Sequence, residues 1–240
     1  MNRKKSSESI KENPKSAPNV LSPISLPSPK FDQGTSVLSA LKKRKTVRSI
    51  SSKKLSLQVL SNLLWAACGV NRKKGPFGIM GRTAASASNS QEIDLYVALP
   101  EGIYLYDAIF HKLMPVATGD LRAMAIGPGQ GSAGAQAPVR LIYVVDIDKF
   151  SKAGFQEPGL WDPEIQKSYY YVDTGLIAGN VYLFAASQGL VAWFHNCNKA
   201  ALAEKLNLRP HQHILFGQTI GSPERYFFIS PVFDRRTTIR

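Results

Sequence analysis

Residues 173–190 read DTGLIAGNVYLFAASQGL, and this stretch decides the fold. From Val172 to Gln188 the chain is mostly apolar, with Gly175 and Gly179 among its small residues. This composition predicts a long buried helix, and the small residues permit close packing against a second helix. A buried strand is expected directly afterwards, over Leu190–His195. We expect such a helix to build a subunit interface.

The segments around this stretch mix helix and strand signals in irregular order. Two apolar runs separated by Pro100-Glu101-Gly102 predict a β-hairpin, and the run RLIYVVDI at 140–147 predicts a central buried strand. Leucines in residues 55–64 recur at helical spacing, with Ser52 or Ser56 as the N-cap and Gly69 as the stop. No regular βαβ order is visible, which indicates an α+β fold with a mixed, mainly antiparallel sheet flanked by helices. The other expected elements are the strands Ile93–Leu99, Ile103–Tyr106 and Ile214–Ile220 and the short helix Lys199–Leu206.

The composition excludes several classes of protein. The 240 residues are 44% hydrophobic and 10% aromatic, which is enough for a sizeable core and excludes a disordered chain or a fibrous repeat. No apolar run approaches the ~18–20 residues of a membrane span, and we expect a cytoplasmic protein. Cys68 and Cys197 are too few for a disulfide framework and are expected to be reduced structural thiols. The net charge of +13 indicates an anionic partner.

The chain divides into three parts by composition. Residues 1–34 are rich in Ser, Pro, Lys and Asn and predict a disordered or extended tail, with Pro18–Pro29 running extended over a surface. Its basic start lacks the apolar stretch of a secretory signal, so export is not expected. Residues 35–223 are the expected folded domain, and residues 224–240 a C-terminal extension. Between Lys42 and Lys74 ten Lys and Arg residues occur without Asp or Glu, which leaves open a basic nucleic-acid-binding module.

Conventional catalytic and metal-binding sets are weakly represented. His211 and His213 have no accompanying Cys or carboxylate cluster, which disfavours a metal site. His195 and Cys197 lie two residues apart, where strand side chains share a face without being aligned for proton transfer. The run GPGQGSAG at 127–134 lacks the spacing of a nucleotide loop. If the chain is an enzyme, its reactive atoms belong to a cofactor and not to a protein nucleophile.

Two polar segments suit a flat, phosphorylated cofactor. The sequence RKTVR at 44–48 places three cations and a hydroxyl within five residues, a set that can grip a phosphate and leave one positive charge over. The sequence RTAASASNSQ at 82–91 combines small residues with polar side chains, so that a flat ligand could approach the backbone and pair its polar edge. Taken alone, each segment also fits a solvated helix end or a polar loop before a strand.

Together with residues 173–190, these segments resemble the nitroreductase superfamily of FMN-dependent oxidoreductases over Ser39–Pro223. That family has an RRSxR-like phosphate motif, an RxxPSAxNxQ-like loop before a strand, and a DxGxxxxNxxLxAxxxGL-like helix and strand. The sequence GQTIGSP at 217–223 resembles its last core strand. The sequence EGIYLYD at 101–107 is similar to the branch that includes azoline-forming dehydrogenases. The resemblance implies an intertwined homodimer with two FMN molecules at the subunit interface.

The resemblance also implies which residues contact FMN. The basic segment would hold the phosphate and ribityl chain, and Arg48 would stabilise negative charge at the pyrimidine edge. The polar loop would line the flavin from the partner subunit, Gln130 would lie at the flavin edge, and Phe194–Asn196 would lie near N5. A C-terminal arginine would complete the phosphate site. The full set is Arg44, Lys45, Thr46, Arg48, Ser86, Ala87, Asn89, Gln91, Gln130, Phe194, His195, Asn196, Arg235 and Arg236.

The activity implied by the resemblance has two steps. NADH or NADPH would deliver hydride to flavin N5, and an electron-poor small molecule such as a nitroaromatic or quinone would then be reduced at the same site. A flavin dehydrogenase acting on a peptide-derived heterocycle is an alternative, motivated by the 101–107 sequence. The nucleic-acid-binding module is the alternative from another class, although its charges coincide with the phosphate motif.

Overall fold

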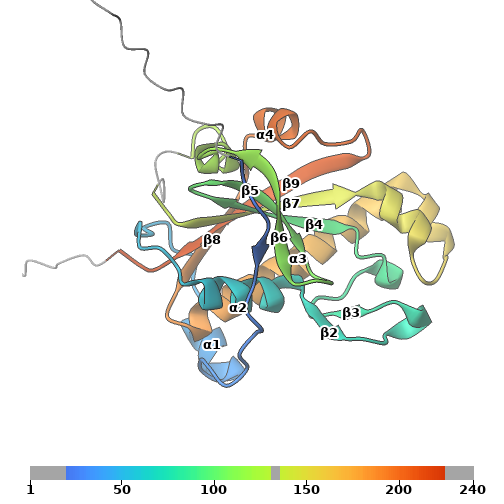
Figure 1. Ribbon diagram of the computed structural model, residues 1–240. Coiled ribbons are helices and arrows are strands. Elements are labelled where there is room, and N and C mark those ends of the chain that lie inside the picture. The colour runs from blue at the N-terminus through green and yellow to red at the C-terminus, as the bar shows by residue number, and fades with distance from the viewer. Residues whose placement is uncertain (1–19, 131–135, 225–240) are drawn as a thin grey trace, which may run out of the picture.

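A computed structural model describes residues 20–130 and 136–224. Within these residues one seven-stranded sheet has the order β1-β6-β5-β4-β7-β9-β8, and every strand pair in it is antiparallel (Figure 1). A separate hairpin pairs β2 with β3. The strands are β1 Ile24–Ser25, β2 Val70–Arg72, β3 Gly81–Arg82, β4 Ile93–Leu99, β5 Gly102–Asp107, β6 Lys112–Thr118, β7 Val139–Asp146, β8 Val191–His195 and β9 Gln212–Gly221.

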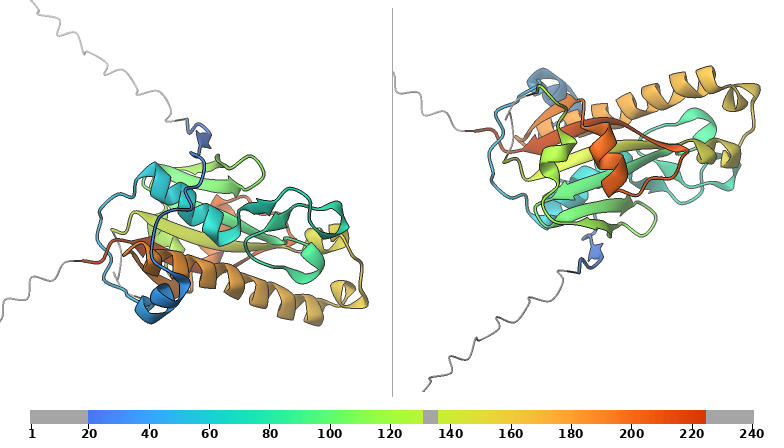
Figure 2. Two further views of the ribbon diagram at one scale, coloured as in Figure 1. Left: turned by 90° about the horizontal axis from the view of Figure 1, so that it is seen from below. Right: turned by 90° about the horizontal axis from the view of Figure 1, so that it is seen from above.

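Helices cover both faces of this sheet, as Figure 2 shows, and the α+β prediction is confirmed. α2 and α3 pack on one face over the larger core, which includes Leu63, Val97, Leu141 and Val181. α4 and the 3-10 turn η3 pack on the other face. The helices are α1 Val37–Lys43, α2 Leu57–Cys68, α3 Pro163–Ser187 and α4 Lys199–Lys205, and the 3-10 turns are η1 Pro76–Gly78, η2 Ala87–Asn89, η3 Arg122–Ala125, η4 Ile147–Lys152 and η5 Pro158–Trp161.

The sheet follows the apolar runs of the sequence closely. β4 has the predicted bounds, and β4 pairs with β5 up to Leu99 and Gly102, so the predicted hairpin at Pro100-Glu101-Gly102 is present. β7 lies between β4 and β9, and all of its residues are buried, as expected for a continuous apolar run in a central strand. The side chain of Ser56 caps α2 at Val59 N, and Gly69 follows its last residue.

Helix α3 begins at Pro163, well before the expected start at Val172. The side chain of Asp162 accepts hydrogen bonds from the first-turn amides, and Pro163 occupies the first helical position, where its missing N–H costs nothing. Most positions in the extra turns are exposed, and Tyr169 and Tyr170 are the ones that pack on the buried clusters, so no apolar stripe at helical spacing marks these turns. Opposite the buried face of α3, Val172 and Leu176 are exposed.

The residues before α1 form a strap across the sheet and α2. β1 pairs with β6, and the carbonyl of Pro27 accepts a hydrogen bond from Ser61 Oγ at 2.5 Å. Lys30 N donates to Asn62 Oδ1 at 2.9 Å. The chain at Pro27 and Lys30 is therefore hydrogen-bonded to α2.

Candidate functional site

The basic segment 44–48 runs along the outer edge of strand β8. Arg44 caps the C-terminus of α1, and Thr46 forms a parallel bridge with Ala192. Val47 N donates to Ala192 O at 3.1 Å, so the backbone of the segment is fixed to the sheet. The side chains of Arg44, Lys45 and Thr46 are exposed. The segment therefore presents cations from a rigid backbone.

Tyr182 of α3 connects three of the predicted site residues and was missed at the sequence level. Its hydroxyl accepts a hydrogen bond from Phe194 N at 2.9 Å and lies 3.1 Å from Thr46 Oγ1. The guanidinium carbon of Arg44 lies 5.6 Å from the centre of the Tyr182 ring. The only available signal was the position of Tyr182 two residues after Asn180 in the helix motif, which does not reveal the direction of the side chain.

Five predicted residues line one open pocket of about 570 Å³ beside strand β8. This volume lies in the range of small-ligand sites. The guanidinium carbon of Arg48 lies 5.4 Å from the centre of the Trp193 ring at one side of the pocket. Gln130 Oε1 accepts a hydrogen bond from Gly127 N at 3.0 Å. The lining residues are Arg48, Gly129, Gln130, Trp193, Phe194, His195, Asn196 and Phe216.

His195 lies at the base of this pocket as a neutral imidazole. Burial lowers the pKa of His195 to about 4. Nδ1 lies 2.7 Å from Asn196 O, which can only accept, so Nδ1 carries the proton and Nε2 accepts from Thr219 Oγ1 at 2.8 Å. Both ring nitrogens are thus engaged within the protein. His195 contributes shape to the pocket, and its ring lies 4.5 Å from that of Trp193.

The polar loop 86–91 has an unusual backbone. Ser88, Asn89 and Gln91 have φ values of 47°, 55° and 51°. These values lie in the left-handed region, which is unfavourable for residues other than glycine. Hydrogen bonds hold this conformation: Ala87 N donates to Asp173 Oδ2 at 2.9 Å, and Gln91 N donates to Ser86 Oγ at 3.0 Å. The amide nitrogen Nδ2 of Asn89 is buried and has no partner among the described residues.

Gln91 joins the loop to the β2–β3 hairpin. Its Oε1 accepts from Arg82 Nε at 2.7 Å, and its Nε2 donates to Met80 O at 2.6 Å and to Asn89 Oδ1 at 3.0 Å. Its carbonyl accepts from Lys149 Nζ at 3.3 Å. The hydrogen-bonding groups of the Gln91 side chain therefore all have partners within the chain, and Gln91 links the loop to the hairpin.

Two buried carboxyl groups lie beneath the loop. Glu92 is fully buried, and burial together with the charge of Asp173 raises the pKa of Glu92 to about 8. Ser90 Oγ donates to Glu92 Oε2 at 2.7 Å. Glu92 Oε1 has no donor among the described residues but can itself donate to Asp173 once protonated. The pair therefore holds one proton on Glu92 while Asp173 accepts the N–H of Ala87.

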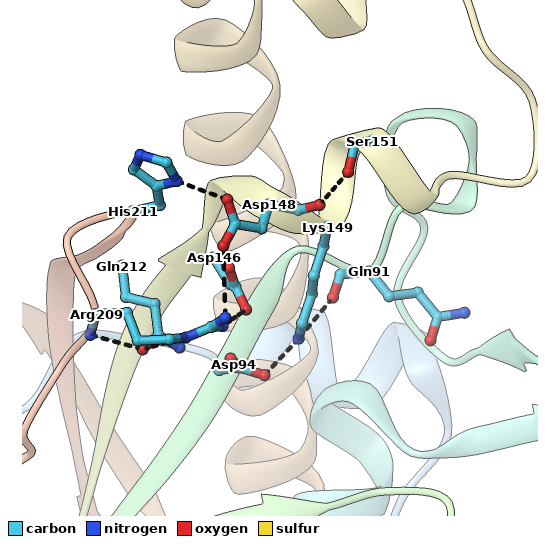
Figure 3. Close-up of polar contacts among 9 residues, drawn as sticks. All are labelled: Gln91, Asp94, Asp146, Asp148, Lys149, Ser151, Arg209, His211 and Gln212. Atoms are coloured by element: carbon cyan, nitrogen blue, oxygen red, sulfur yellow. Dashed lines mark hydrogen bonds and ion pairs between the residues drawn. The ribbon is translucent and has the colours of Figure 1, made fainter.

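A charged network supports the same end of the sheet (Figure 3). Lys149 Nζ lies 2.5 Å from Asp94 Oδ1, and Arg209 pairs with Asp146 at 2.5 Å and Asp148 at 3.4 Å. His211 Nδ1 donates to Asp148 Oδ1 at 2.6 Å, which lowers the pKa of Asp148. No cluster of metal-ligating side chains occurs in the ranges 20–130 and 136–224.

The loop and the pocket lie at opposite ends of the central strand. Ile93, directly after the loop region, pairs with Val145 near the end of β7. Trp193 of the pocket pairs with Thr219, which pairs with Arg140 near the start of β7. Val145 and Arg140 are five residues apart on β7, which corresponds to about 17 Å along the strand. One chain therefore brings together Arg48, Gln130 and Phe194–Asn196 but keeps the 86–91 loop apart from them.

Three sequence features fall outside this geometry. Arg235 and Arg236 lie outside the described residues, as does part of the glycine-rich run 127–134. Cys68 and Cys197 are buried and unpaired with each other, and burial raises the pKa of each thiol to about 11. No helix within the described part of the chain has the length and apolar character needed to cross a membrane.

Comparison with known proteins places these motifs in one family. The model of the family described as "Nitroreductase family" matches residues 41–222. The crystal structure of a "putative nitroreductase" from Ralstonia eutropha JMP134 is 35% identical, covers 85% of this chain and 90% of its own, and has a TM-score of 0.74. A "putative nitroreductase" of Methanocaldococcus jannaschii is 28% identical over 155 residues, which is 62% of this chain and 72% of that protein. A chain of the E. coli microcin synthetase McbBCD complex, 18% identical, shares the fold with a TM-score of 0.59 over 82% of this chain and 77% of its own.

Proposed function

This chain belongs to the nitroreductase family, and from that premise we propose that it binds FMN and uses NADH or NADPH to reduce an electron-poor acceptor such as a nitroaromatic or a quinone. Family membership makes it a flavin-dependent oxidoreductase in general terms. The observation that carries the finer proposal is the pocket of about 570 Å³ that contains Arg48, Gln130 and Phe194–Asn196 next to the rigid basic segment.

The residues present fit FMN. A phosphate needs cations and neutral donors, and Arg44, Lys45 and Thr46 supply both from a backbone fixed to β8. The flat ring system needs an open, partly apolar pocket, which Trp193 and Phe216 help to line. The buried Nδ2 of Asn89 has no hydrogen-bond partner in the described part of the chain, so it can donate to an acceptor atom of a bound ligand.

A homodimer would unite the two halves of the site. The loop 86–91 and the pocket lie about 17 Å apart along the strand direction, and strands β7 and β9 separate β4 from β8, so in this proposal the loop that meets each flavin comes from a second copy. The exposed face of α3 supports such a contact, because Val172 and Leu176 are 60% and 44% exposed. Gly175 and Gly179 on α3 have open space above them, which allows close approach of another helix.

In this proposal the side chains of the protein bind and orient the cofactor, and none of them acts as a nucleophile. Bound FMN would supply the two-electron transfer between the nicotinamide and the acceptor. Arg44, Lys45 and Thr46 would bind its phosphate, and Tyr182 would hold Thr46 in place. Arg48 would place positive charge beside the pyrimidine edge, where reduction adds negative charge. His195, neutral and engaged at both nitrogens, would not move a proton.

The test is an absorption spectrum of the purified protein after incubation with FMN and desalting. Retained flavin absorbance, and FMN in the supernatant after heating, are the expected results. A colourless protein that takes up no FMN would refute the proposal. If the protein retains FMN, the rates of NADH and NADPH oxidation with a nitroaromatic or a quinone would define the electron donor and the acceptor. The homodimer and the cytoplasmic location remain predictions, and sedimentation velocity tests the first.

A second candidate is a dehydrogenase acting on a peptide-derived heterocycle. The fold likeness to a chain of the microcin synthetase complex and the observed β4–β5 hairpin with the EGIYLYD sequence favour it. Oxidation of a heterocyclised peptide without NAD(P)H oxidation would support it.

The nucleic-acid alternative is weaker, because helix α2 separates the cations at 42–48 from those at 72–74 along the chain. A salt-dependent gel shift would revive it.

A further inference from the structure

We propose that the β2–β3 hairpin carries a binding surface for a flat, negatively charged acceptor, formed by the stacked rings of Phe77 and Phe155 together with Lys73 and Lys74. The inference rests on the proposed function, because it assigns this surface to the mouth of the flavin site. The surface would select among acceptors by charge and shape, whereas the flavin pocket itself would hold the cofactor.

The hairpin is strongly basic. Residues 70–82 read VNRKKGPFGIMGR and contain Arg72, Lys73, Lys74 and Arg82 but no acidic residue. The first three of these side chains are exposed. None of the ion pairs found within the described ranges involves them. A tip with uncompensated positive charge attracts anions and raises their local concentration.

An aromatic platform accompanies the charge. The ring centroids of Phe77 and Phe155 are 5.7 Å apart with an interplanar angle of 25°, a stacked arrangement. Phe77 is 58% exposed and Phe155 52% exposed. Gly154 permits this contact, because a Cβ there would lie 2.6 Å from Phe77 Cβ. Phe77 also has a φ of 59°, an unfavourable conformation for a residue with a side chain.

The hairpin is attached to the loop that is proposed to line the flavin. Gln91 accepts from Arg82 Nε and donates to Met80 O, so the second strand of the hairpin is fixed to the loop. Phe77 lies five residues before Arg82, within about 17 Å along an extended chain. If the loop contacts the flavin of the partner subunit, the hairpin tip lies at the entrance to that same site.

These features select one chemical class of ligand. A benzoate-type or naphthoquinone-type acceptor with an acidic substituent can place its ring against the Phe77–Phe155 stack and its negative group near Lys73 and Lys74. A neutral acceptor can use only the rings. A cationic acceptor would be repelled. Packing of a second copy of this chain on the two rings is the competing use of the surface, and it predicts loss of dimer when the rings are changed.

The experiment compares 4-nitrobenzoate with the neutral 4-nitrobenzyl alcohol on the FMN-loaded protein. In the variant K73E/K74E we expect the KM for 4-nitrobenzoate to rise about fivefold at low ionic strength, with a smaller effect at high salt, and the KM for the alcohol to stay unchanged. The matched control is K53E/K54E, which changes the charge equally at the other end of α2. Equal KM ratios in the two double variants would overturn the proposal.

Two further measurements separate the possible failures. Ligand-observed NMR of 4-nitrobenzoate reports binding without turnover, so the surface is tested even if the protein takes up no FMN or oxidises no nicotinamide. Loss of FMN uptake would refute the proposed function, whereas equal nitrobenzoate binding by wild type and K73E/K74E would refute the surface. The variant F155S should weaken binding of both ligands and leave the oligomeric state unchanged. A monomeric F155S protein would assign the rings to a subunit contact and overturn the proposal.

Discussion

Replacing Glu92 by glutamine isolates the proton held beneath the 86–91 loop. Glutamine has the shape of a protonated glutamate: its oxygen can accept from Ser90 Oγ, and its amide can donate to Asp173 in place of the carboxyl proton. We therefore expect the variant Glu92→Gln to fold with the loop in place. Unlike glutamate, glutamine keeps this donor at every pH.

The magnitude follows from the raised pKa of Glu92. The pKa is about 8 in the folded protein and 4.5 in the unfolded chain, so between these values the folded state binds more protons. Raising the pH therefore favours unfolding, and the stabilisation present below pH 4.5 is lost up to about pH 8. The unfolding equilibrium shifts about tenfold per pH unit in this window, which gives about 4 kcal/mol between pH 4.5 and pH 7.5.

Urea denaturation of wild type and Glu92→Gln from pH 5 to pH 9 measures this effect at fixed protein concentration, because a dimer's stability depends on concentration. The stability of the variant relative to wild type should grow with pH up to about 8 and then level off. Glu204→Gln on the exposed side of α4 is the matched control and should run parallel to wild type. A constant difference between Glu92→Gln and wild type would show that Glu92 does not hold the proton.

Four other changes test the proposed site and the strap. Arg44→Ala should weaken FMN binding by about 1.5–3 kcal/mol in equilibrium dialysis, because a charged partner of the phosphate is lost. Tyr182→Phe should weaken it by about 1 kcal/mol by releasing Thr46, and an unchanged FMN affinity would contradict that role. Arg48→Ala should keep FMN bound but lower its reduction potential in a dye-equilibration titration, and a wild-type potential would remove Arg48 from the pyrimidine edge. Deletion of residues 1–30 should leave FMN content intact yet lower the urea midpoint, since the strap contacts on α2 are lost; equal midpoints would show that the strap adds no stability.

Continuous apolar runs made much of the sheet predictable. β4 and β7 are buried throughout or nearly so, and their sequences carry the signal without reference to the rest of the chain. β6 was missed because Pro115 interrupts it and its exposed positions alternate near the sheet edge, where proline is tolerated. The early start of α3 was missed because a cap and a proline define it and no apolar stripe accompanies them.

The site was predictable as a set of segments but not as an arrangement. Local sequence identifies the basic segment and the polar loop by their chemistry. Their separation along β7 depends on strand order and register, which are tertiary properties. The roles of Tyr182 and Glu92 depend on side-chain direction and burial, and a single tyrosine or glutamate in a sequence carries neither.

The attachment of residues 46–47 to β8 has a consequence for the solubility of the protein. β8 is the last strand of the sheet, and an open last strand invites addition of strands from other molecules. Here Val47 N occupies the carbonyl of Ala192, and the Tyr182 hydroxyl occupies the amide of Phe194. The segment that carries the cations is therefore also a barrier to self-association. Deleting residues 46–47 would expose the unpaired edge of β8 to other molecules. Point substitutions that leave the backbone intact are therefore the better way to study the charges of this segment.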